Sequence, residues 1–187
     1  MKTNRFHDLR DYQFAKGEKL IFDTNVWLYI FPQDTTSSTG ALRAKYMASF
    51  NAIRAGGKIF LDAFVLSEYL NRYARSEWEW HNRNQKQAVF HSYKDFRNSP
   101  FYDETVAKTL KVAGKLSAYC ERVDILFTQY DFERLLIDHS RGVCDFNDSV
   151  LMATCRHHGY KLVTHDADFA AVDYDLDILT HNARLFS

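Results

Sequence analysis

The chain has 187 residues, of which 46% are apolar and 16% aromatic, enough for one globular domain with a core of its own. Its 24 basic residues balance its 24 acidic residues, which excludes the overall positive field of a strong nonspecific nucleic-acid binder. No apolar run approaches the ~20 residues that cross a bilayer, and the three cysteines form no C-x-x-C pair, so neither a membrane span nor a zinc knuckle is expected.

The N-terminal part, residues 1–18, precedes the first apolar segment and reads as an extension of the domain. It lacks the continuous apolar core of a signal peptide, so we expect a cytoplasmic protein with reduced thiols. Beyond it, short apolar segments bounded by polar or glycine residues recur, which is the pattern of buried parallel strands. We expect strands at Lys19–Phe22, Lys58–Leu61, Val123–Phe127 and Lys161–Thr164, with Ile178–Thr180 as a fifth.

Segments with helical spacing of apolar residues lie between these strands. They are Ala41–Arg54, Phe64–Arg75, Glu104–Tyr119, Asp131–His139 and Asn147–His158. Gly56 and Gly57 stop the first helix, and the last one has Asn147 as a candidate N-cap and Gly159 just past its end. The alternation of strands and helices predicts an α/β fold, with a mostly parallel central sheet of four or five strands covered by helices on both faces.

The stretch from about residue 76 to 99 is rich in Trp, Asn, Gln, Arg and His. No linker rich in Pro, Gly or Ser separates it from the rest. We therefore interpret residues 76–118 as a helical insertion within a single domain that spans residues 1–187.

Acidic residues stand at positions where parallel strands end or helices begin. Asp23 follows the first strand, Asp166 follows the strand near the C-terminus, and both are expected at the carboxyl edge of the sheet, where open α/β sheets bind ligands. Asp148 lies in the first turn of a helix, where the amide dipoles favour an anion, so we expect a low pKa and an ionised carboxylate. Glu68 lies among apolar helix positions and must be solvated, paired or bound to metal.

Four gathered carboxylates repel one another unless a cation joins them. Oxygen-only ligation suits one or two Mg²⁺ or Mn²⁺ ions, and such ions activate water for phosphodiester hydrolysis. Isolated aspartates at strand ends and helix N-termini are also common turn and capping residues, and that interpretation stays open on spacing alone.

Three segments of the chain, LIFDTNVWLYIF, VLSEYLNR and DFNDSVLMATCRHHGYKLVTHDADF, resemble in this order the signature blocks of the PIN-domain family. The resemblance spans most of the chain. It implies a fold similar to that of flap nucleases and a metal-dependent ribonuclease activity like that of the VapC-type toxins of toxin–antitoxin pairs. By position it assigns the catalytic, metal-binding acids to Asp23, Glu68, Asp148 and Asp166.

The resemblance also implies a supporting set of small polar residues that orient the carboxylates, namely Thr24, Asn25 and Thr164. Asp145 is an alternative or additional ligand beside Asp148, or else a loop carboxylate before the N-cap. Asp168 is a secondary ligand or an Asx-turn acceptor.

Other polar residues fit the site less well. Asp62 follows a strand but is better explained as the N-cap of the next helix. The pair His157-His158 and the single His165 invite a zinc proposal, yet adjacent helical residues point to different faces and do not share one ion.

Contacts to RNA are left unassigned. Basic residues that border the expected cleft are Arg72, Arg75, Lys111, Lys115 and Arg141, and aromatic candidates for base stacking are Tyr29, Trp78 and Trp80. For each of them a solvated face or a packing role is the simpler interpretation.

The expected function is therefore a Mg²⁺- or Mn²⁺-dependent endoribonuclease acting on single-stranded or structured RNA, as the toxin of a type II pair or in a housekeeping role. The resemblance implies a separately encoded antitoxin and a homodimer as further partners. The chain is longer than compact VapC-type toxins, which weakens the toxin assignment. A non-catalytic nucleic-acid or protein-binding scaffold and a flap-like DNA nuclease stay open as alternatives.

Overall fold

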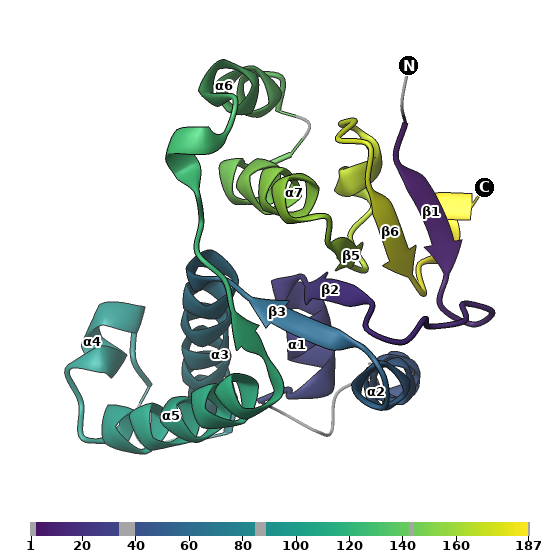
Figure 1. Cartoon of the computed structure of the whole chain (residues 1–187). Helices are drawn as coiled ribbons and strands as arrows, with labels where there is room; N and C mark the ends of the chain where they lie inside the picture. Colours follow the sequence, from purple (N-terminus) through teal and green to yellow (C-terminus); the bar gives the residue numbers. More distant parts are fainter. Residues whose placement is uncertain (1–2, 34–39, 85–88, 143, 187) are drawn as a thin grey trace.

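The computed structural model describes residues 3–33, 40–84, 89–142 and 144–186. Within these ranges six strands form one parallel sheet in the order β1-β6-β5-β2-β3-β4 (Figure 1). The strands are β1 (Arg5–Asp8), β2 (Lys19–Phe22), β3 (Lys58–Leu61), β4 (Glu121–Arg122), β5 (Lys161–Val163) and β6 (Asp177–Thr180). The α/β class and the parallel sheet are as predicted, but the sheet has six strands among the described residues instead of four or five.

The central strands are held by burial. Leu20, Ile21 and Leu162 are fully inaccessible to solvent, because helices cover both faces of the sheet and leave no polar side for alternation. Ile21 pairs with Phe60 of β3 on one side and with Leu162 of β5 on the other. The residues that follow β2, β3 and β5 therefore emerge at the same edge.

The described part of the chain forms seven α-helices. They are α1 (Thr24–Ile30), α2 (Gly40–Arg54), α3 (Ala63–Asn84), α4 (Tyr93–Arg97), α5 (Phe101–Tyr119), α6 (Phe132–Ser140) and α7 (Phe146–His158). Different helices cover the two faces of the sheet. Figure 1 shows α6 and α7 on one side of the sheet and α1, α2 and α5 on the other. Among the described helices, none combines the length and apolar character that crossing a membrane requires.

The predicted strand at Val123–Phe127 was wrong in position. The strand is only Glu121–Arg122, and the chain then forms a short 3₁₀ helix at Phe127–Gln129. The backbone N–H of Val123 still bonds the carbonyl of Leu61, but Asp62 already turns into α3. Beyond that point β3 offers no backbone for a longer strand to pair with.

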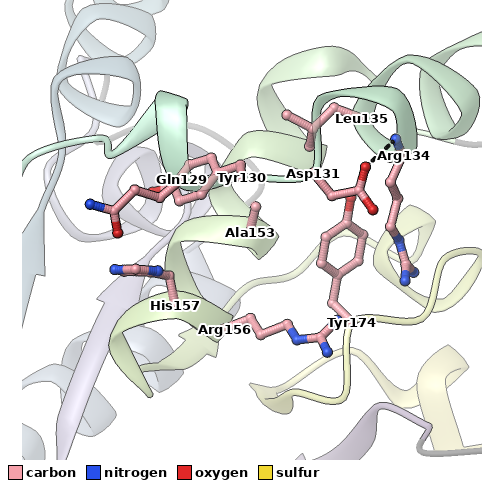
Figure 2. A pocket seen from close by; sticks show the side chains of 9 residues that line it. All are labelled: Gln129, Tyr130, Asp131, Arg134, Leu135, Ala153, Arg156, His157 and Tyr174. Carbon is pink, nitrogen blue, oxygen red and sulfur yellow. Dashed lines mark hydrogen bonds between the residues drawn. The ribbon is translucent and has the colours of Figure 1, made fainter.

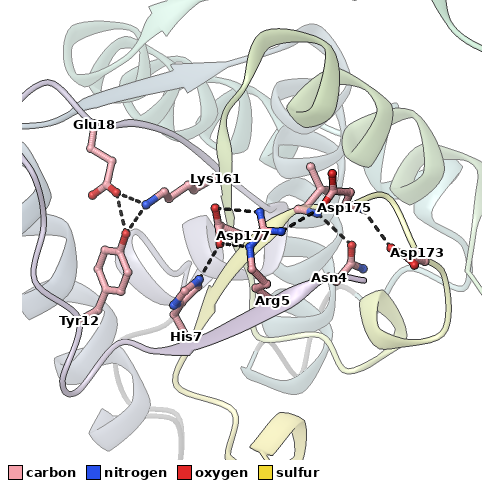
Figure 3. Close-up of polar contacts among 10 residues, drawn as sticks. Asn4, Arg5, His7, Tyr12, Glu18, Lys161, Asp173, Asp175 and Asp177 are labelled. Atoms are coloured by element: carbon pink, nitrogen blue, oxygen red, sulfur yellow. Dashed lines mark hydrogen bonds and ion pairs between the residues drawn. The ribbon is translucent and has the colours of Figure 1, made fainter. Parts of the chain in front are cut away.

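Strand β1 lies inside the segment interpreted as an N-terminal extension, where no strand was predicted. It pairs with β6 and is fixed by polar contacts (Figure 3). The guanidinium of Arg5 binds the carboxylates of Asp175 and Asp177, each at 2.9 Å, and His7 Nε2 lies 2.7 Å from Asp177. Further along, the Tyr12 hydroxyl donates to Glu18, which also pairs with Lys161 at the start of β5.

Helix α3 runs nine residues beyond the predicted end at Arg75 and forms, with α4 and the start of α5, a helical arm (Figure 1). The arm has an aromatic cluster of its own, in which His81 contacts Phe90, Phe96 and Phe101. In the region predicted as a helical insertion, α3, α4 and α5 supply most of the described residues, residues 89–92 and 98–100 lie between the helices, and residues 85–88 are outside the described part.

Helix α7 ends at His158, as predicted, and the glycine that follows allows a test of how much its backbone conformation contributes to stability. Gly159 has φ 67°, in the left-handed region, and a Cβ added there would meet nothing within 4 Å. Gly159→Ala is expected to lower the free energy of unfolding by about 1–2 kcal/mol, because only the backbone conformation penalises the change. Chemical denaturation measures it.

Gly114 is the matched control for this substitution. It lies inside α5, an added Cβ also meets nothing within 4 Å, and its φ is not positive. Gly114→Ala should therefore stabilise the protein by about 0.5–1 kcal/mol. Equal effects of the two alanines would contradict this account.

Candidate active site

The candidate active site lies at the carboxyl ends of β2 and β5. From β2 the chain continues to β3 and β4 on one side, whereas β5 is followed by β6 on the other, so the strand order reverses between β2 and β5. Such a switch point leaves a crevice in open α/β sheets. Asp23 directly follows β2, and Thr164, His165 and Asp166 directly follow β5.

A hydrogen-bond network centred on Thr164 joins the two strand ends. The buried Thr164 hydroxyl donates to the Asp23 carboxylate at 2.7 Å and accepts from the backbone N–H of Asp166 at 3.0 Å. The side-chain amide of Asn25 donates to both Asp23 and Thr164, and its oxygen accepts from the N–H of His165. Thr164 and Asn25 thus both donate hydrogen bonds to the Asp23 carboxylate.

Glu68 approaches the same edge from α3. One of its carboxylate oxygens accepts a hydrogen bond from the Thr24 hydroxyl at 3.0 Å, and the other pairs with Arg72, one turn further along the helix, at 3.3 Å. The Glu68 side chain is 36% exposed. Thr24 therefore ties Glu68 to the end of β2, beside Asp23.

Asp148 enters from the N-terminus of α7, and the predicted cap of this helix was wrong. The N-cap is Asp145 and not Asn147, because the helix already begins at Phe146 and the Asp145 carboxylate accepts from the N–H of Asp148 at 2.9 Å. Asp145 is exposed, and capping accounts for its position.

The carboxylates share one electrostatic field. Burial raises the pKa of Asp23 to about 7, with Glu68 and Asp166 adding to the rise and the hydrogen bond from Thr164 opposing it. Burial also raises the pKa of Asp148 to about 8, aided by the charges of Asp145, Asp23, Asp166 and Glu68. The prediction that the helix dipole keeps Asp148 ionised was wrong, because burial and four neighbouring carboxylates outweigh the dipole.

The set of donors fits a hard divalent cation. All four predicted acids supply oxygen atoms, and two of them are hard to ionise together without a compensating positive charge. Across the described residues, however, no three or more His, Cys, Asp or Glu side chains form a group arranged to hold an ion. Hydrogen bonds from Thr164 and Thr24 direct Asp23 and Glu68 in this structure.

Sequence comparison identifies the family. The family described as "PIN domain" matches residues 20–174, most of the chain. The chain belongs to the PIN domain family. PIN domains are generally nucleases that use divalent metal ions. None of the curated proteins matches the chain.

Two solved structures that match this chain are distant from it in sequence. A chain from the crystal structure of VapBC2 from Rickettsia felis, bound to a DNA fragment from their promoter, has a TM-score of 0.52 and 13% identity, over 87% of this chain and 98% of the other. PAE2754 from Pyrobaculum aerophilum has a TM-score of 0.43 and 13% identity, over 91% and 88% of the two chains. At this identity the first of them shows a common fold only.

Two acids of this PIN domain lie near the site in other roles. The backbone N–H of Asp168 donates to the Asp166 carboxylate at 3.0 Å, so Asp166 and not Asp168 accepts in the turn, and Asp168 is exposed. Asp62 accepts from the N–H of Val65 at 2.8 Å, which confirms it as the cap of α3, although its second oxygen is buried with no hydrogen-bond partner.

The basic and aromatic candidates for RNA contacts separate into near and distant ones. Trp78 donates to the carbonyl of Phe90 within the helical arm, and Arg75 lies over the ring of Tyr93, so both support the arm. Arg72 and Tyr29 lie near the acids. Arg72 forms an ion pair with Glu68, and the charges of Arg72 and Asp166 act in opposite directions on the pKa of Tyr29.

The hollows of the surface differ in their relation to the acids. One of about 550 Å³ opens beside Asp166 and is lined in part by Asn182 and Arg184, two residues to which the sequence analysis gave no role. The sequence signal that could have indicated them is their position shortly after β6, at the same carboxyl edge of the sheet as the acids. A hollow of about 400 Å³ between α6 and α7 lies apart from the acids (Figure 2). Its Arg134 already pairs with Asp138.

The network predicts a change in the acidity of Asp23 when Thr164 is altered. Thr164→Val keeps the shape but removes the hydroxyl, so the pKa of Asp23 in metal-free protein should rise by about one unit, the equivalent of one hydrogen bond to a charged group. Thr164→Ser keeps the hydroxyl and should leave the pKa near the wild-type value. Titration of the Asp23 carboxyl carbon by NMR measures both, and identical titrations of the two variants would refute the role of Thr164.

Proposed function

We propose that this PIN domain is a Mg²⁺- or Mn²⁺-dependent endoribonuclease in which Asp23, Glu68, Asp148 and Asp166 form the metal-binding and catalytic centre. The observation that carries the proposal is that the charges of Glu68 and Asp166 raise the pKa of both Asp23 and Asp148 at the switch point of the sheet. Carboxylates whose pKa is raised by burial and by neighbouring charges mark candidate functional sites.

The four acids have different parts in this proposal. Asp23, oriented by Thr164 and Asn25, supplies the most buried carboxylate, and Asp166 lies beside it through the same threonine. Glu68 and Asp148 approach from α3 and α7. When bound, one or two divalent ions supply a water of lowered pKa and positive charge for the phosphate.

RNA as substrate and the toxin role rest on the resemblance of the sequence to VapC-type toxins. The VapBC2 chain from Rickettsia felis supports them only as a neighbour in fold. In a toxin–antitoxin pair the antitoxin would be a separate chain. A homodimer is proposed because dimers are common among PIN domains of this type. We include both partners and a cytoplasmic location in the proposal.

A non-catalytic scaffold is the second candidate. The complete set of four acids counts against it, but metal-ligating residues do not by themselves establish turnover. Under this hypothesis the cleft binds nucleic acid or protein without turnover. A flap-like DNA nuclease would use the same acids, and only its substrate distinguishes it from a ribonuclease.

Cleavage assays decide between these functions. Purified protein free of partners is incubated with labelled single-stranded RNA, structured RNA, single-stranded DNA and a DNA flap, each with Mg²⁺, with Mn²⁺ and with chelator. Cutting of RNA that requires metal is the expected result. Cutting of the DNA flap alone would show that the protein is a DNA nuclease and not a ribonuclease. Binding of RNA without any cutting would favour the scaffold.

A further inference from the structure

The hollow of about 550 Å³ beside Asp166 has the size of a binding site for a small ligand. It forms where the segments that follow β5 and β6 meet the start of α1. Six of its lining residues matter for its chemistry: Asn25, Tyr29, His165, Asp166, Asn182 and Arg184. Asp166 belongs to the acidic centre and Asn25 donates a hydrogen bond to Asp23, so the hollow and that centre are continuous.

Asn182 fixes the part of the hollow that comes from the C-terminal segment. Its side-chain amide donates to the carbonyl of His165 at 2.7 Å, which ties the end of β6 to the end of β5. Its side-chain oxygen accepts from the backbone N–H of Arg184 at 3.1 Å, and its own N–H donates to the Thr180 hydroxyl. The backbone of Arg184 is thereby held at the rim of the hollow.

An aromatic group forms another wall and is equally well held. The ring of Tyr29 stacks on Tyr46 with centroids 5.5 Å apart, and the ring of His165 meets both edge-on. The Tyr46 hydroxyl donates to the carbonyl of Thr164 at 3.1 Å. The half-buried Tyr29 therefore offers a fixed aromatic surface beside the acids.

Charged residues of both signs line the hollow, and Arg184 is the residue among them whose charge attracts a phosphate. Asp166 and Asp168, which both line the hollow, and the acids behind them repel a polyanion until cations bind. Of the described side chains that line the hollow, Arg184 is the only lysine or arginine. Arginine and an aromatic ring that line the same hollow are a combination with which proteins bind single-stranded nucleic acids, with the phosphate on the cation and the base on the ring.

We propose that this hollow binds the nucleotide next to the scissile phosphate of a single-stranded RNA, with the Arg184 guanidinium on its phosphate and its base against Tyr29. The inference rests on the proposed nuclease function for its substrate class. It adds a specific site, whose residues come from α1 and from the C-terminal segment after β6.

Binding and cleavage measured separately test this subsite. Affinity for a short labelled single-stranded RNA is measured by fluorescence anisotropy in chelator at several salt concentrations, and KM and kcat are measured with Mn²⁺. Arg184→Gln should weaken binding about tenfold and reduce the salt slope by about one, since one phosphate contact is lost. Arg184→Lys keeps the charge and should retain most of the affinity.

Two further variants separate the subsite from general charge. Arg83→Gln removes the same charge from the far end of α3, where Arg83 donates to the carbonyl of Glu79, and should bind RNA like the wild type. Tyr29→Leu should weaken binding about tenfold through lost stacking, without changing the salt slope. Thermal unfolding confirms that each variant is folded.

The outcomes distinguish the subsite from the nuclease. If the wild type cleaves RNA and Arg184→Gln has its affinity, KM and salt slope, the subsite is wrong and the proposed function stands. If the wild type cleaves nothing but loses RNA affinity in Arg184→Gln and not in Arg83→Gln, the subsite is supported and the nuclease proposal fails. Equal losses in both arginine variants would overturn the subsite.

Discussion

Asp23→Asn is expected to lower metal-dependent RNA cleavage by this PIN domain at least about 10³-fold, because the most buried carboxylate of the centre loses its charge. The change is nearly isosteric. The remaining side-chain oxygen still accepts from Thr164, so the fold should be preserved. Initial rates on single-stranded RNA with Mn²⁺ measure the loss, and circular dichroism confirms the fold.

Asp103→Asn is the matched control for this variant. Asp103 lies exposed in the first turn of α5, in the helical arm and away from the acids, and its substitution removes the same charge. It should cleave at the wild-type rate. Undiminished cleavage by a folded Asp23→Asn protein would mean that the acids at the switch point are not the catalytic centre.

The second expected result is a loss of stability with rising pH in the metal-free protein. The pKa is about 7 for Asp23 and about 8 for Asp148 in the folded state, well above the ordinary value of an aspartate in the unfolded chain. Between these values the folded state holds protons that the unfolded state has released, so stability falls as pH rises from about 4 to about 8.

Bound metal should reverse this loss. In chelator, the melting temperature is expected to fall by about 5–10 °C between pH 5 and pH 8. Mn²⁺ should restore it at pH 8, where the carboxylates are free to ligate, and have little effect at pH 5, where both are protonated.

The pH series has its own internal control. Asp8 and Asp177, whose hydrogen bonds from arginine lower the pKa of each to about 2, affect stability only below pH 4, outside the tested range.

The double variant Asp23→Asn with Asp148→Asn should show a flatter profile without a response to Mn²⁺. His165 and His181, whose burial lowers the pKa of each, add a rise of stability with pH in the same range in both proteins. A wild type that loses no more stability between pH 5 and pH 8 than the double variant would therefore contradict the raised pKa values.

Predictions from the sequence succeeded where burial imposes a local pattern. Strands β2 and β3 were placed at their observed bounds, and β5 and β6 within one residue, because strands covered on both faces need continuous apolar segments. The end of α7 at Gly159 was also local, since the left-handed conformation requires a residue such as glycine.

Failures occurred where a distant partner decides the structure. Arg5–Asp8 carries few apolar residues and becomes a strand because β6 supplies the pairing and Asp175 and Asp177 hold Arg5. The strand expected at Val123–Phe127 was shortened because β3 turns into α3 at Asp62. Neither cause lies within the segment concerned.

For the candidate site, the order of residues along the chain was enough to place acids after β2 and β5 at one edge of a parallel sheet, and the motifs were enough to indicate the family. The ionisation of those acids required the tertiary structure, because burial and charges from three other elements raise the pKa of Asp148 against its own helix dipole. The same is true of the position of Arg184, which lines the hollow beside Asp166 where Asn182 ties the end of β6 to the end of β5. Local sequence determines conformation and burial pattern, whereas electrostatic fields and binding surfaces sum over residues that only folding brings together.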